Sequence, residues 1–371
     1  MTRGVLVHEW LARAGGSENV FEAMAEVFPD ADLLCLWNDH PERFGSRAVA
    51  ETWLGRTGLR RNKTLALPLM PGTWRGRRPG GYDWALVSSH LFAHHVTFAA
   101  TAPHFRKYVF VHSPARYIWN PELDARGAGL APRMVAPALR TLDRARAQEA
   151  HAIAANSRFV QQRIRQAWHR DSVVIYPPVQ VERIQQVPTW SECLDEDDAG
   201  ILGSLPETFL LGASRFIQYK RLDLVIEAGE ASGLPVVLAG SGPLRQELAA
   251  LAARASVPVV IVEAPSDTLL FALYERALAL VFLAVEDFGI VPVEAMAAGA
   301  PVIARRMGGV AETVQDSRTG VLVDDVGRAS LRRAVEQVTS LDRDAPRHRA
   351  RDFSAARFGR ELRGWMAEEL S

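Results

Sequence analysis

Two carboxylates, Glu286 and Glu294, lie eight residues apart around a predicted strand-to-helix turn. The short apolar run 277–284 is typical of a buried parallel strand. The run 290–298 then predicts a helix of small residues that ends at Gly299. Carboxylates at such a turn can accept hydrogen bonds from the hydroxyl groups of a ligand.

The start of this predicted helix could also bind an anion, because the first amides of a helix have no partner within it and lie at the positive end of its dipole. These amides belong to Phe288, Gly289, Ile290 and Val291. A diphosphate fits there, and the two glutamates would then bind the hydroxyls of a sugar and a ribose. The structural alternative is that Glu294 is an acid favoured by the helix dipole, worth about 0.3–1 kcal/mol, and that Glu286 merely ends a strand.

Two cations follow another predicted strand, 209–213. Arg215 and Lys220 are five residues apart on a short loop, so both can reach the carboxyl edge of a parallel sheet, where open α/β folds bind ligands. Fixed cations there would stabilise the negative charge that develops on a departing nucleoside diphosphate. The alternative for this pair is an ordinary solvated basic loop.

These motifs resemble those of a known family. Glu286 and Glu294 with the segment 295–304 resemble the donor motif of the retaining family 4 glycosyltransferases, which adopt the GT-B fold. The segments 214–228, 308–314 and 319–323 resemble the basic donor segment and the C-terminal signature of the same family. Residues 8–10, 15–18 and 111–119 resemble more narrowly the mannosyltransferase-like branch that builds bacterial surface polysaccharides.

The resemblance assigns roles to further residues. It implies that His112 contacts the transferred sugar and helps catalysis, together with Arg215, Lys220 and Glu286. It also implies that the nucleotide base lies at Ala264 and Pro265. Gly15 and Gly16 precede a predicted helix and would let the backbone approach a phosphate or sugar closely. From the residues alone, His112 could equally be structural and the two glycines a plain loop.

No metal or other cofactor is expected, because the nucleotide-sugar is a substrate and no Asp-x-Asp follows a predicted strand. The one dense acidic cluster, 195–198, is predicted to lie in a loose linker. There is also no placed carboxylate pair for a double displacement. The resemblance therefore implies retention by front-face attack, in which the leaving phosphate oxygen deprotonates the acceptor hydroxyl.

Composition limits the class of protein. The 371 residues are 48% hydrophobic and 23% charged, which is enough to bury the cores of two domains. The net charge is zero at neutral pH, which gives no basic field for nucleic acid. The two cysteines, Cys35 and Cys193, lack metal-ligand spacing, and the chain passes from Met1 directly into a predicted strand. We expect a reduced, cytoplasmic protein.

Short apolar runs alternate with helical patterns, which predicts an α/β protein with two Rossmann-like, doubly wound parallel sheets facing a central cleft. The expected strands are 5–7, 32–36, 84–88, 107–111 and 152–155 in the first half, and 209–213, 236–239, 259–262, 278–283, 302–304 and 320–323 in the second. Helices are expected at 17–27 and 132–150. Paired prolines, Pro177 and Pro178, predict the boundary between domains.

We therefore expect an acceptor-binding domain at 1–177, a donor-binding domain at 178–352, and a C-terminal helix at 353–371 that returns to the first domain. The expected reaction moves a hexose, mannose from GDP-mannose, onto a lipid-linked or polysaccharide acceptor. The alternatives are a UDP-sugar donor with a polysaccharide or small natural-product acceptor, and a catalytically silent subunit that binds a sugar nucleotide.

One segment suggests where the acceptor lies. Between Leu54 and Gly81 there are no acids, apolar residues alternate with basic ones, and the basic residues are Arg56, Arg60, Arg61, Lys63, Arg75, Arg77 and Arg78. Such a segment could contact anionic lipid at the inner face of a membrane. The alternative is an ordinary solvated loop that contributes a few leucines to the core.

Overall fold

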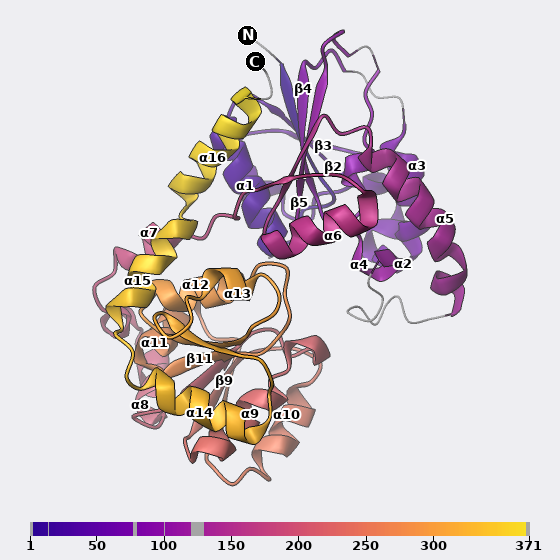
Figure 1. Ribbon diagram of the computed structural model, residues 1–371. Helices are drawn as coiled ribbons and strands as arrows, with labels where there is room; N and C mark the ends of the chain where they lie inside the picture. Colours follow the sequence, from indigo (N-terminus) through magenta and orange to yellow (C-terminus); the bar gives the residue numbers. More distant parts are fainter. Residues whose placement is uncertain (1–2, 14, 77–79, 100, 120–129, 369–371) are drawn as a thin grey trace. The chain divides into compact units, whose positions relative to one another are not determined.

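The computed structural model describes residues 3–13, 15–76, 80–99, 101–119 and 130–368. The chain divides into two compact units (Figure 1). Unit 1 comprises Met1–Pro178 and Ala356–Ser371, and unit 2 comprises Val179–Ala355. Among the described residues, no helix has the length and apolarity needed to cross a bilayer.

Unit 1 is built on a seven-stranded parallel sheet with the order β3-β2-β1-β4-β5-β6-β7. Its strands are β1 (Gly4–His8), β2 (Asp32–Cys35), β3 (Val49–Glu51), β4 (Trp84–Ser89), β5 (Arg106–Val111), β6 (Ala152–Ala155) and β7 (Val173–Val174). The strand order reverses between β1 and β4, so the carboxyl ends of these two strands flank the position where such sheets bind ligands.

Helices cover the sheet of unit 1. The longer ones are α1 (Gly16–Val27), α5 (Leu130–Ala147) and α6 (Arg158–Trp168). Between β3 and β4 the described residues form short helical segments, which are η2 (Trp53–Arg56), η3 (Gly58–Arg61), α2 (Lys63–Ala66), η4 (Leu67–Leu69) and α3 (Met70–Trp74). The last helix, α16 (Ala355–Glu368), buries Phe358, Leu362 and Trp365 in the same core as β1 and β2. The predicted return of the C-terminal helix to the first domain is therefore confirmed (Figure 1).

Unit 2 repeats the plan with a six-stranded parallel sheet in the order β10-β9-β8-β11-β12-β13. Its strands are β8 (Leu210–Ala213), β9 (Val236–Gly240), β10 (Val259–Glu263), β11 (Ala279–Phe282), β12 (Val302–Arg305) and β13 (Gly320–Val323). Its helices are α7 (Val181–Gln185), α8 (Glu196–Ser204), α9 (Asp223–Ser232), α10 (Arg245–Ala252), α11 (Asp267–Arg276), α12 (Ile290–Ala297), α13 (Val310–Thr313), α14 (Arg328–Val338) and α15 (Asp344–Ala350). Here the order reverses between β8 and β11.

The acidic segment that was predicted as a loose linker is instead the start of helix α8. Asp195 is the N-cap, and its Oδ1 accepts a hydrogen bond of 2.8 Å from the amide of Asp198. Glu196, Asp197 and Asp198 occupy the first turn, where the helix dipole favours negative charge. The prediction was wrong because it took the high acidic charge as a sign of a loop and did not recognise Asp195 as a helix N-cap.

Two strands, β3 and β7, were not predicted. Both are short and lie at the two edges of the sheet in unit 1. Their residues are largely exposed or half-buried, so neither strand has the continuous apolar run that marks a buried parallel strand. β3 is a strand because it pairs with β2, and β7 because it pairs with β6. These pairings join segments that are separated in the chain, so a local sequence pattern does not predict them.

Candidate functional site

In unit 2 one predicted cation, Lys220, and the first predicted carboxylate, Glu286, meet at the reversal of strand order. β8 leads into the loop that carries Lys220, and β11 leads into the turn that carries Glu286. Lys220 Nζ donates a hydrogen bond to Glu286 Oε1. The two side chains are only 9% and 19% exposed, so the pair is largely withdrawn from water. An ion pair at this depth holds both groups in a defined position.

Arg215 lies on the same loop but is exposed. Its Nη2 donates to the hydroxyl of Tyr219 over 3.3 Å. The ring of Tyr219 also lies 5.4 Å from Lys220 Nζ, so this tyrosine contacts both cations. Sequence reasoning missed Tyr219, although its position between the two cations was a usable signal.

The turn before α12 is shaped by glycines. Gly289 caps the helix with a φ of 96°, which a residue with a side chain rarely adopts. Gly309 donates its amide to the Glu286 carbonyl oxygen over 2.8 Å, and a Cβ on it would lie 2.2 Å from the Asp287 carbonyl oxygen. The start of α12, with Phe288, Gly289, Ile290 and Val291, is therefore held by a second loop 20 residues away in sequence.

Glu294 lies in the second turn of α12, beyond the reach of a strong dipole effect. Burial raises the pKa of its carboxyl to about 7, and the negative charge of Asp267 acts in the same direction. The dipole effect is confined to the first turn, so the position of Glu294 does not support the dipole explanation of this residue. Glu294 also helps to raise the pKa of Tyr274, whose buried hydroxyl has no hydrogen-bond partner in the described residues.

The segment predicted to hold the base follows β10. Ala264 has a φ of 46°, and its amide donates to the carbonyl oxygen of Gly240 over 3.0 Å. A Cβ on Gly240 would lie 1.9 Å from the Ser214 carbonyl oxygen. Ala264 and Pro265 therefore lie beside the loop after β9, and that loop in turn lies close to the loop after β8.

In unit 1, His112 directly follows β5 at the carboxyl edge of the sheet. Its Nε2 lies 2.8 Å from Ser88 Oγ, and Ser88 Oγ lies 3.0 Å from Nδ1 of His8. Both His8 and Ser88 are fully buried. The structure thus connects the predicted sugar-contacting histidine to the ends of β1 and β4, a link that sequence reasoning missed.

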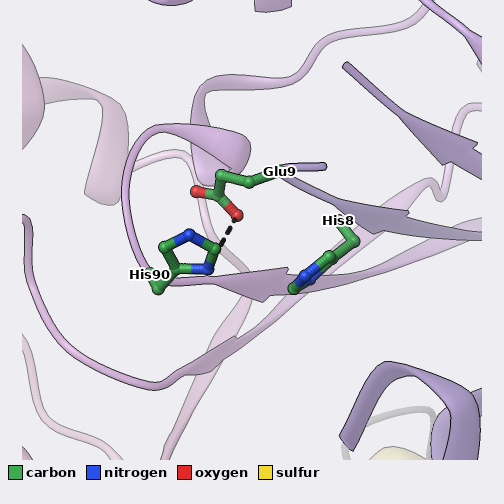
Figure 2. A group of neighbouring side chains, drawn as sticks. All are labelled: His8, Glu9 and His90. Carbon is green, nitrogen blue, oxygen red and sulfur yellow. Dashed lines mark ion pairs between the residues drawn. The ribbon is translucent and has the colours of Figure 1, made fainter. Parts of the chain in front are cut away.

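Glu9 lies beside this group, and Figure 2 shows its carboxylate directed at His90. Its Oε1 accepts hydrogen bonds from the amides of Leu91 and Ala93 over 2.7 and 2.8 Å. Its Oε2 lies 3.8 Å from His90 Nδ1. Burial raises the pKa of Glu9 to about 7, although the backbone amides oppose this shift. Glu9 thereby ties the loop after β4 to the end of β1.

Gly15 and Gly16 lie at the start of α1, with Gly15 as the N-cap. A Cβ on Gly15 would lie 2.1 Å from Oε2 of Glu18, whose side chain is buried. The Glu18 carboxylate also accepts hydrogen bonds from Ser17 Oγ over 2.8 Å and from the Ala12 amide over 3.4 Å. The space that the glycines create is therefore partly used by a carboxylate of the same helix.

Two groups in the described residues could hold a metal ion by spacing. Ligand atoms of His8, Glu9 and His90 lie within 4.8 Å of one another (Figure 2). The second group is His94, His95 and Asp143, but Asp143 Oδ2 already accepts from two indoles over 2.7 Å each. Neither group was singled out from the sequence.

Comparison with known proteins agrees with this geometry. The GT-B glycosyltransferase fold is shared with HepE of Anabaena in complex with UDP-glucose, which has a TM-score of 0.72, 17% identity, and coverage of 98% of this chain and 99% of that one. Sucrose-phosphate synthase from Thermosynechococcus elongatus gives a TM-score of 0.70 at 18% identity, with 100% and 99% coverage. The predicted architecture of two Rossmann-like domains is confirmed.

A family model matches most of the second unit. Residues 196–355 match the model of the family described as "Glycosyl transferases group 1", and so form a domain of that kind. A GDP-mannose-dependent alpha-(1-6)-phosphatidylinositol monomannoside mannosyltransferase of Mycobacterium tuberculosis is 35% identical over 168 residues, 38% of this chain and 40% of that protein. A D-inositol 3-phosphate glycosyltransferase of Streptomyces bingchenggensis is 29% identical over 293 residues, 72% of this chain and 61% of that protein. The matches thus span less than two thirds of these relatives.

Proposed function

We propose that this protein is a retaining glycosyltransferase of family 4 that transfers a hexose from a nucleotide-sugar. The observation that carries the proposal is the partly buried pair of Lys220 and Glu286 beside the start of α12, inside a glycosyl transferases group 1 domain. A cation, a carboxylate and a helix N-terminus at one sheet edge suit a diphosphate linked to a sugar.

Each group has a separate task in the proposed reaction. Arg215, Lys220 and the amides at the start of α12 bind the diphosphate and stabilise its growing charge as the glycosidic bond breaks. Glu286 accepts hydrogen bonds from the transferred sugar, and Glu294 from the ribose. His112 contacts the transferred sugar. The departing phosphate oxygen takes the proton of the acceptor hydroxyl, which then attacks the same face of the sugar.

The donor that we propose is GDP-mannose, and the acceptor is lipid-linked or a growing polysaccharide. The donor is supported by the mannosyltransferase relative, which is GDP-mannose-dependent. A UDP-sugar is the second candidate, because the structural neighbour HepE binds UDP-glucose. A thermal-shift panel of GDP, UDP, ADP and their sugars separates the two, since a ligand at 100 times its Kd stabilises a protein by about 2.7 kcal/mol. Stabilisation by none of them would contradict the proposed function.

Turnover should not depend on an added divalent metal ion, because Lys220, Arg215 and the helix amides already neutralise the leaving group. The initial rate should be unchanged within error after dialysis against EDTA. A rate abolished by EDTA and restored by magnesium or manganese would contradict this expectation. The metal content of the dialysed protein should be measured in parallel, because the spacing of His8, Glu9 and His90 could also hold an ion.

Donor binding should release a proton near pH 6.5, because the pKa of Glu294 is about 7 in the unliganded protein. Hydroxyl donors of a ribose favour the ionised carboxylate, so binding should lower this pKa and affinity should rise as the pH approaches 7. Calorimetry of the intact nucleotide-sugar in two buffers of different ionisation enthalpy measures the proton. Proton release should be absent in Glu294→Gln. Proton uptake by the wild type would contradict the proposed binding of the ribose by Glu294.

The same raised pKa predicts how stability changes with pH. The folded protein holds the Glu294 proton more tightly than the unfolded chain, whose carboxyl has the ordinary pKa of 4.5. This contribution is complete below pH 4.5 and is lost as the pH rises through about 7. Without ligand, the melting temperature of the wild type should therefore fall relative to that of Glu294→Gln over this interval.

Contact with anionic membrane remains a proposal, and the structure sharpens its test. Arg75 pairs with Glu149 and Arg60 with Asp39, while Arg77 and Arg78 lie outside the described residues. The exposed basic residues of this segment are Arg56, Arg61 and Lys63, and they accompany the exposed apolar side chains Trp53, Leu65 and Leu69. These six residues define a basic apolar surface.

Co-sedimentation with liposomes tests that surface. Binding should require anionic lipid and should fall with added salt, because each basic residue near the lipid contributes about 1 kcal/mol. Replacing Arg56, Arg61 and Lys63 with serine should remove most of it. The matched control replaces Arg328, Arg332 and Arg333 on the exposed face of α14. Equal partitioning of both triple variants and the wild type would exclude this surface and favour a soluble acceptor.

A further inference from the structure

Three adjacent strands of unit 1 end in side chains that form one hydrogen-bonded row. His8 ends β1, Ser88 lies near the end of β4, and His112 follows β5. The register places His8 directly beside Ser88, and the His112 amide donates to the Ser89 carbonyl oxygen over 2.8 Å. The side-chain contacts are His8 Nδ1 to Ser88 Oγ at 3.0 Å and Ser88 Oγ to His112 Nε2 at 2.8 Å. The row lies at the reversal of strand order.

The direction of these hydrogen bonds follows from a third contact. His8 Nδ1 also lies 3.3 Å from the carbonyl oxygen of Ser88, and a carbonyl can only accept. The proton of His8 is therefore on Nδ1 and is donated to Ser88. A hydroxyl oxygen can accept two hydrogen bonds, but the proton of the buried Ser88 hydroxyl also needs an acceptor. Nε2 of His112 is the remaining contact of Ser88 Oγ in the described part of the chain, so the hydroxyl donates to it. In its neutral form, His112 consequently carries its proton on Nδ1.

The opposite direction is disfavoured at both ends of the row. It would place a lone pair of His8 Nδ1 against the Ser88 carbonyl oxygen. It would also place a proton on His8 Nε2, which is buried and has no hydrogen-bond partner in the described residues. A buried donor without an acceptor loses the hydrogen bond that it makes to water in the unfolded chain, so this direction is unfavourable.

The first two members of the row have no exposure to solvent. His8 and Ser88 are both fully buried, and the His8 ring stacks on Phe21 with centroids 5.1 Å apart. The rings of His8 and His90 lie near one another, with centroids 5.5 Å apart, and Glu9 is fixed beside His90 by backbone amides (Figure 2).

We propose that His8 is a positioning residue that acts through Ser88 to hold His112 as its Nδ1–H tautomer. This inference rests on the proposed function, in which His112 contacts the transferred sugar. A histidine held in this form offers the sugar an N–H donor, while its other nitrogen is occupied by Ser88. It therefore stabilises an oxygen of the donor sugar by hydrogen bonding and does not remove the proton of the acceptor.

Nitrogen-15 NMR of histidine-labelled full-length protein tests the tautomer without any assay of activity. Long-range proton–nitrogen spectra distinguish protonated from unprotonated ring nitrogens, and the His112→Gln variant assigns the His112 signals among the ten histidines. The wild type should show His112 protonated on Nδ1 alone. Ser88→Ala and His8→Leu should show a mixture of both tautomers. His8→Asn should restore the single tautomer, because the asparagine amide nitrogen replaces Nδ1 as the donor.

Steady-state kinetics with the donor selected by the ligand panel form the second arm. Ser88→Ala and His8→Leu should lower kcat about tenfold, the effect of about one net hydrogen bond, with little change in KM. His8→Asn should recover most of the rate. His104→Asn, on an exposed histidine of the same unit, should leave both the tautomer and the rate unchanged. Melting temperatures identify any variant that fails to fold.

Each result decides a distinct point. A proton on His112 Nε2 in the wild type, or an unaltered Nδ1–H signal in Ser88→Ala, would overturn the proposal. A changed tautomer with an unchanged kcat would overturn the positioning role in turnover. If the wild type transfers no sugar from any nucleotide, the proposed function fails, while the NMR arm still decides whether His8 and Ser88 set the tautomer of His112.

Discussion

Arg215→Ala and Lys220→Gln should each lower kcat by roughly 100-fold or more with little loss of folding, as removal of an electrostatic transition-state donor does. Glutamine is chosen at position 220 because it can still donate to Glu286 while removing the charge. Alanine there would leave the Glu286 carboxylate, 19% exposed, without its partner. The fall in kcat of Lys220→Gln then measures the effect of removing the positive charge beside the diphosphate.

The control is Arg332→Ala, which removes an equally charged side chain from an exposed i,i+4 pair on α14. Such a pair contributes about 0.3–0.5 kcal/mol, so both rate and melting temperature should be close to those of the wild type. Activity within a few-fold of wild type in both Arg215→Ala and Lys220→Gln would rule out the diphosphate assignment. A large loss in the control as well would indicate a general electrostatic effect.

Glu286→Gln and Glu294→Gln should separate binding of the sugar from binding of the nucleotide. Glu294 should hold a ribose that donor and product share, so its variant should weaken binding of the free nucleoside diphosphate. Glu286 should touch only the transferred sugar, so its variant should mainly lower kcat, by about 100-fold. Calorimetry with the nucleoside diphosphate and steady-state kinetics together measure both effects.

Amide variants are preferred because they preserve shape. Glu286→Gln still offers an oxygen to Lys220, and Glu294→Gln removes the group whose pKa burial raises. The matched control is Glu336→Gln, because Glu336 is an exposed glutamate that pairs with Arg332 on the surface of α14. Equal weakening of free nucleotide binding in Glu286→Gln and Glu294→Gln would show that the two roles are wrongly assigned.

Much of the architecture could be predicted from local patterns. Eleven strands were expected from apolar runs, and each is present within a residue or so of its predicted bounds. The helix after Glu286 begins at Ile290 as expected, and Gly299 follows its end with a φ of 95°. These features depend on residues close together in the chain, so the sequence reports them directly.

The prediction of the site was less complete, because a contact between distant residues leaves no local pattern. Arg215, Lys220, Glu286 and Glu294 were singled out as candidates, but Tyr219 and Gly309 were not connected with them. Tyr219 binds Arg215, and Gly309 holds the turn of Glu286 by a backbone hydrogen bond. Their catalytic and binding roles stay predictions that the variants above can decide.

The sequence by itself determined eleven of the strands, their order along the chain, and that two carboxylates and two cations follow strand ends. Only the tertiary structure decided which of those ends are neighbours. Lys220 meets Glu286, 66 residues away, because β8 lies beside β11, and His8 reaches His112 through Ser88 because β4 lies between β1 and β5. Neighbouring strands of a parallel sheet are joined by hydrogen bonds between segments that are distant in the chain. The local periodicity of the sequence therefore does not show which strands are neighbours.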